Sequence, residues 1–140
     1  MPTFDSYMDD LAEYARKANE RVKASLGATK EELQSQVSTA RASIEQTNRR
    51  LEEKATSSEP SKRWNEARQS WNNHTAEIRQ KADAEKTKHD AARAERRAGW
   101  AEADALESID FAYLALEEAE YEVLEAALAR AEADALAAKV

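Results

Sequence analysis

The sequence predicts an all-α protein, because apolar residues recur at helical spacing and residues that break helices are rare. Steps of three and four residues place side chains on one stripe of a helix, and such steps run through most of the 140 residues. The chain has only two glycines and two prolines, too few for the turns of a β-sandwich or a Rossmann-type fold. Charged residues make up 35% of the chain, which is typical of helices with solvated faces.

A first helical arm is predicted over residues 3–57, where the apolar stripe slips by one residue near its middle. Gly27 favours the end of a helix at this slip, and Thr29 and Glu32 form the Thr-x-x-Glu pattern of a capping box. We therefore expect a kink or short interruption at 27–29. The stripe consists of Phe4, Met8, Leu11, Ala15, Ala18, Val22, Leu26, Leu33, Val37, Ala40, Ile44 and Leu51.

The clearest helix stop is the predicted turn at 56–60. Pro60 lacks a backbone donor and disfavours helical geometry in the residue before it. Ser58 is suited to cap the next helix, with Pro60 in its first turn. A second arm is predicted over 61–140, with Gly99 as the one candidate position for a break.

The two arms are predicted to pair as a long antiparallel hairpin or coiled coil within one helical domain, 1–140. Folding at the turn places position i opposite roughly 117 − i, so that Ile44 lies near Trp71. The alternative is a compact four-helix bundle, with breaks at 27–29 and at Gly99. The residues expected to hold the hairpin near its turn are Val37, Ile44, Leu51, Trp64 and Trp71.

The hairpin leaves residues 114–140 without a partner from their own chain, although this segment is strongly apolar. Its apolar residues form two stripes, more than one neighbouring helix covers. A second copy of the chain is the simplest cover, which predicts a homodimer with four helices at its centre. Its parallel or antiparallel orientation stays open. The predicted self-association residues are Leu114, Leu116, Tyr121, Val123, Leu124 and Leu128.

The net charge is −7, and the charged residues are unevenly distributed along the chain. Residues 60–99 carry ten basic and six acidic residues, whereas residues 102–134 carry eleven acidic residues and one basic residue. Solvated helix faces account for most such asymmetry. The sharper interpretation is that the exposed acid row Glu118, Glu122 and Glu125 binds a basic protein, or the basic third of another copy.

No constellation in the sequence favours catalysis, so we expect a protein that is not an enzyme and has no cofactor. There is no cysteine, no nucleophile elbow and no glycine-rich phosphate loop. His74 and His89 lack the Glu-x-x-His spacing of di-metal bundles. A carboxylate-bridged metal bundle is therefore only the third alternative. The basic segment is too diluted by acids to indicate nucleic-acid binding.

The predicted function is therefore that of a non-catalytic structural or adaptor coiled coil, acting through self-association and helix-mediated partner binding. The alternative is an amphipathic protein on a lipid or hydrophobic granule surface, although anionic membranes repel the acidic segment. The sequence has no membrane-spanning run and its first 25 residues do not resemble a signal peptide. We accordingly expect a cytoplasmic location.

Overall fold

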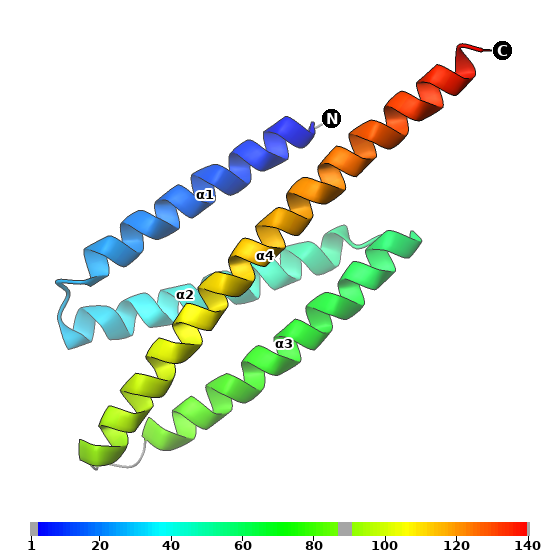
Figure 1. Ribbon diagram of the computed structural model, residues 1–140. Helices are drawn as coiled ribbons and strands as arrows, with labels where there is room; N and C mark the ends of the chain where they lie inside the picture. Colours follow the sequence, from blue (N-terminus) through cyan, green and yellow to red (C-terminus); the bar gives the residue numbers. More distant parts are fainter. Residues whose placement is uncertain (1–2, 87–90, 140) are drawn as a thin grey trace. The chain divides into compact units, whose positions relative to one another are not determined.

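The computed structural model describes residues 3–86 and 91–139, and every regular element within these ranges is an α-helix. The prediction of an all-α protein is thus confirmed. Figure 1 shows the order of the elements along the chain. The four helices are α1 (Phe4–Ser25), α2 (Lys30–Lys54), α3 (Glu59–Lys86) and α4 (Ala91–Ala137).

The chain divides into two units, which are described separately below. The N-terminal unit, Met1–Asn73, contains α1, α2 and the first half of α3. The C-terminal unit, His74–Val140, contains the second half of α3 and all of α4. The single helical domain over 1–140 stays a prediction.

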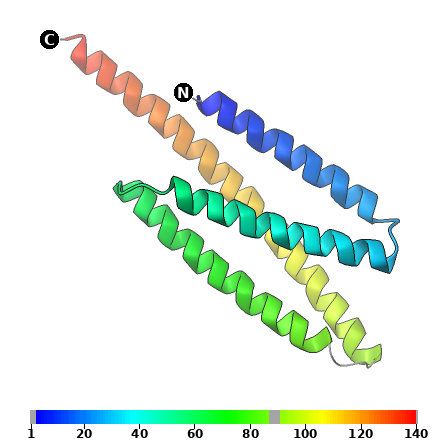
Figure 2. The same ribbon diagram turned by 180° about the vertical axis from the view of Figure 1, so that it is seen from behind.

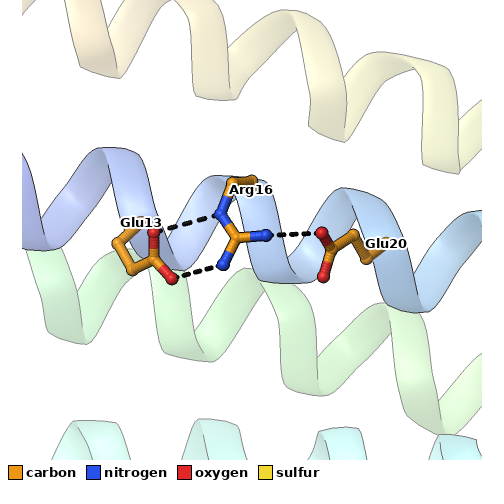
Figure 3. A network of polar contacts seen from close by, with 3 residues as sticks. All are labelled: Glu13, Arg16 and Glu20. Atoms are coloured by element: carbon orange, nitrogen blue, oxygen red, sulfur yellow. Dashed lines mark hydrogen bonds and ion pairs between the residues drawn. The ribbon is translucent and has the colours of Figure 1, made fainter.

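A network of ion pairs lies on the exposed side of α1, as Figure 3 shows. The helix begins where the Thr3 hydroxyl accepts a hydrogen bond from the backbone N–H of Ser6, at 3.2 Å. More than two turns further along, the Arg16 guanidinium donates to Glu13 Oε2 at 3.0 Å and to Glu20 Oε1 at 2.5 Å. These pairs join residues three and four positions apart, the spacing at which helical side chains are neighbours.

The same network shifts the protonation of two of its members. The hydrogen bond from Arg16 lowers the pKa of Glu13 below its ordinary value, because a bonded cation favours the carboxylate, and partial desolvation opposes this. The same bond raises the pKa of Arg16. Both groups are surface groups, so water and salt weaken the interaction.

The chain is interrupted between α1 and α2, as predicted for 27–29. The Thr29 side chain accepts from the N–H of Glu32 at 3.2 Å, and the Glu32 carboxylate accepts from the N–H of Thr29 at 3.4 Å. This is the predicted capping box. It satisfies donors that the first turn of a helix otherwise leaves unpaired.

The interruption reverses the chain instead of kinking one continuous arm. Lys54 Nζ, at the end of α2, lies 5.9 Å from the ring centroid of Tyr7, near the start of α1. The first arm predicted over 3–57 is therefore two antiparallel helices. A short connection between helices normally gives antiparallel neighbours, and only a continuous helical backbone through 26–29 would have kept the arm straight.

The turn between α2 and α3 has the capping predicted from the sequence. The Ser58 hydroxyl accepts from the N–H of Ser61 at 3.2 Å, and the Ser61 hydroxyl accepts from the N–H of Thr56 at 2.8 Å. Pro60 lies in the first turn of α3, where its missing N–H removes no helical hydrogen bond.

A hydrogen bond between side chains marks the register of α2 against α3 in the N-terminal unit. Asn72 Nδ2 donates to Asn48 Oδ1 at 3.3 Å, whereas the predicted register places residue 69 opposite Asn48. The predicted hairpin is correct in direction here and shifted by about one helical turn. Figure 2 shows the two helices joined by their turn.

The second arm predicted over 61–140 consists of two helices, and they do not divide at Gly99, the candidate break of the four-helix alternative. Instead α4 runs through Gly99 from Ala91 to Ala137. A glycine inside a helix costs only about 1 kcal/mol relative to alanine, which the remaining 46 residues of α4 easily outweigh. Residues 87–90, between α3 and α4, lie outside the described part of the chain.

None of the described residues is buried, so these helices do not enclose an apolar core. The exposed large apolar side chains have between 39% and 84% of their surface accessible. The residues predicted to hold the α2–α3 hairpin are only partly covered. Leu51 is half-buried, and the others, Trp71, Ile44, Val37 and Trp64, are exposed.

Candidate self-association surface

All six residues predicted for self-association lie on α4, in two stripes. Leu114, Tyr121 and Leu128 are seven residues apart, and Leu124 falls between them at the spacing of a coiled-coil seam. We call these four residues the Leu124 stripe. The other two, Leu116 and Val123, are also seven apart and form a second stripe on another side of the helix.

The Leu124 stripe is the more exposed of the two. Leu114 and Leu124 each have 61% of their surface accessible. On the second stripe, Leu116 is 45% exposed and Val123 is half-buried. The structure therefore brings the four residues of the Leu124 stripe together as one open apolar row along α4.

The length of α4 explains why its own unit does not cover this row. At 1.5 Å per residue, a helix of 47 residues is about 70 Å long. The only other described helix in the unit, α3 from His74 to Lys86, is about 20 Å long. The Leu124 stripe begins 23 residues after Ala91, or about 35 Å along α4, beyond the reach of that segment.

The predicted acid row lies beside the Leu124 stripe. Glu118, Glu122 and Glu125 are three and four residues apart and all exposed, so they share one side of α4. A row of carboxylates next to an apolar stripe has the layout of a helix seam with a charged flank. It suits a helical partner with basic residues at its own flank.

Trp100 belongs to the same surface and was missed by the sequence reasoning, which assigned it no role. It is 46% exposed and precedes Leu114 by fourteen residues, the length of two heptads. That spacing was readable in the sequence. It was overlooked because Glu107, at the intermediate heptad position, interrupts the apolar row.

Apolar side chains are also exposed on α1, outside the surface predicted on α4. Phe4, Leu11 and Val22 are all exposed, and Leu26, just after the helix, is 84% exposed. They belong to the stripe read from the sequence, which was interpreted as the inner face of a hairpin. The structure leaves that face largely open.

The part of the chain that the structure describes has neither a cluster of metal ligands nor a membrane-spanning helix. No group of three or more His, Cys, Asp or Glu residues in 3–84 and 91–139 is placed to hold a metal ion. His89 lies outside these ranges, and His74 lies within α3. Over the same part of the chain, no helix has both the length and the apolar character needed to cross a membrane.

Comparison with known proteins gives no match to a family model, to a curated protein or to a solved structure. The helices themselves define an all-α protein whose longest helix presents an open apolar stripe flanked by acidic residues.

Proposed function

We propose that this protein is a non-catalytic structural or adaptor protein that acts through self-association and helix-mediated binding of a partner. A single observation carries the proposal: none of the described residues is buried, although large apolar side chains occur on every helix. A domain of about 150 residues ordinarily buries about two thirds of the surface of its unfolded chain. Helices that lack this burial are stabilised by packing against another molecule.

The energetic argument is strongest for α4. Isolated helices gain most of their stability from packing an apolar face rather than from helix propensity. Each Å² of apolar surface removed from water contributes about 25 cal/mol, so an open row of Leu114, Tyr121, Leu124 and Leu128 favours association. A second copy of α4 supplies a helical face that covers this row in a homodimer.

The acid row gives the proposed protein a means of choosing its partner. Charged residues that flank an apolar helix seam select partner and orientation more than they add affinity. We assign to Glu118, Glu122 and Glu125 the recognition of basic residues. The cytoplasmic location expected from the sequence belongs to this proposal.

Adsorption to a neutral lipid or granule surface is the competing use of the same exposed side chains. The observation that favours it is the open apolar stripe of α1, with Phe4 and Leu11 near its start. An amphipathic helix of this kind lies in an interface with its apolar side inward. Adsorption does not require a second copy, which separates it from the main proposal.

The deciding experiment is the solution mass of the full chain, measured by multi-angle light scattering over a hundredfold range of concentration. The proposal predicts twice the mass of the 15.7 kDa chain, with helicity that decreases on dilution. A 15.7 kDa particle at every concentration, with unchanged helicity, would overturn it. A monomer whose helicity rises when neutral oil droplets are added would establish the competing function.

A further inference from the structure

One face of α4 carries basic residues near its start and acidic residues further on. Arg93 and Arg96 are exposed, as are Glu118, Glu122 and Glu125. Arg93 precedes Glu118 by 25 residues and Glu122 by 29, which are close to seven and eight turns of 3.6 residues. The two groups of opposite charge therefore share the same side of one continuous helix.

Two large apolar side chains lie on this face between the two charged groups, on either side of the acidic Glu107. Trp100 follows Arg93 by seven residues, and Leu114 follows Trp100 by fourteen. Their exposed fractions are 46% and 61%. The face thus has two charged ends of opposite sign, with the apolar Trp100 and Leu114 and the acidic Glu107 between them.

The charged ends do not neutralise each other within one chain. Arg96 and Glu122 are 26 residues apart, which is about 39 Å along a helix. Surface charges further apart than the Debye length, about 8–10 Å at moderate salt, are largely screened from each other. Each end is therefore available to a charged surface on another molecule.

The charge pattern distinguishes the two ways of placing α4 beside α4 of a second copy. A parallel pair aligns the segment 102–134, with eleven acidic residues and one basic residue, against its own copy. An antiparallel pair centred near residue 109 brings Arg93 beside Glu125 of the second copy and Arg96 beside its Glu122. Each contact then occurs twice, as a two-fold axis requires.

We infer that the chain associates through this face as an antiparallel homodimer, and that the partner of the acid row is the basic start of α4 in the second copy. The inference rests on the proposed function and adds orientation, register and the pairs of residues that meet. In this register Trp100 lies opposite Glu118 of the second copy, and Leu114 lies opposite its Asp104. The acid row is then part of the dimer, not a separate site for another protein.

Charge reversal in the full-length protein tests the inference. The quantity measured is the dissociation constant of the dimer at low salt. Reversal at either end, in R93E/R96E or in E122K/E125K, should raise the dissociation constant about tenfold, since it replaces opposite charges by like charges. The fourfold variant R93E/R96E/E122K/E125K should restore dimerisation. It restores opposite charges only if the two ends meet between chains in antiparallel orientation.

A matched control distinguishes the effect of charges on this face from the effect of net charge. Glu102 and Glu120 are exposed and lie on the opposite side of α4, so that E102K/E120K changes the net charge by the same amount as E122K/E125K. The dissociation constant of this control should stay within about twofold of the original. Equal weakening by both variants would overturn the inference.

Introduced cysteines measure orientation directly, because the natural chain has none. A mixture of the R96C chain and the E122C chain should form a disulfide between the two chains, since bonded cysteines need Cα atoms within about 7 Å. The E125C chain should form none with itself, because the two equivalent positions would be about 48 Å apart in the antiparallel dimer.

The outcomes separate this inference from the proposed function. A dimer that readily forms the E125C disulfide is parallel, which overturns the inference and retains the proposed function. A dimer unaffected by either charge reversal has the same consequence. A monomer at every concentration overturns both.

Discussion

Asn72 and Asn48 are joined by a hydrogen bond of 3.3 Å between their side chains, 24 residues apart in the chain. The bond links α3 to α2 where apolar contact is incomplete, and both residues are half-buried. A polar pair between two helices favours one register over its neighbours, because a shift leaves both groups without this bond. It belongs to a register that the apolar stripe alone does not determine.

Removing one member of this pair should destabilise the protein more than replacing both. N48A should lower the free energy of unfolding by roughly 0.5–1.5 kcal/mol, because it leaves a half-buried amide without this partner. N48L/N72L should be nearly neutral or stabilising, since leucines suit a helix seam. Urea denaturation of both variants tests this. If N48L/N72L is less stable than N48A, the stability lost in N48A does not come from leaving one amide without this hydrogen bond.

The capping box at the start of α2 should contribute measurably to stability. T29A removes the hydroxyl that accepts from Glu32 and should lower the free energy of unfolding by about 1 kcal/mol. Thr39, exposed in the middle of α2, provides the control. T39A should be neutral or slightly stabilising, because alanine has the higher helix propensity. Equal losses of unfolding free energy in T29A and T39A would show that the cap does not stabilise the protein.

Acid should weaken α1 through Glu13. The pKa of this carboxyl is lowered in the folded chain by its bond to Arg16, so the folded state favours the ionised form. The stabilisation is present above the ordinary pKa of glutamate, and it disappears as pH falls through the lower folded value. Circular dichroism of the original chain and E13Q between about pH 6 and pH 2 checks this.

The difference in helicity between these two chains should shrink over that window, and it should also shrink in high salt. The effect is small because the pair is exposed. A difference that is constant with pH would contradict the assigned role of Glu13.

The Leu124 stripe should be required for association. L124E/L128E places two charges in the proposed seam and should give monomers or loss of helicity, because burying an unpaired carboxylate is costly. L136E serves as the control, since Leu136 is on α4 and 64% exposed but outside the stripe. The masses of both variants, measured by light scattering, test this prediction. An unchanged dimer in L124E/L128E would remove this stripe from the interface.

Several local features followed directly from the sequence. The caps at Thr29 and Ser58 were predicted because capping depends on residues three positions apart in the chain. The six predicted association residues do fall on one helix, because helical periodicity is also a local property. The break at Gly99 that the four-helix alternative required is absent for a related reason: glycine weakens a helix slightly but does not end it without a further stop signal.

The sequence by itself determined that the chain is helical, where α1 and α2 begin, and which residues share a stripe, since each depends on contacts within a few residues. The tertiary structure decided that α1 and α2 fold back on each other, as the approach of Lys54 to Tyr7 shows, and that Asn48 faces Asn72. It also decided that the described helices leave their apolar faces open. These features depend on contacts between distant residues, and apolar stripes match at many registers, so only the fold selects among them.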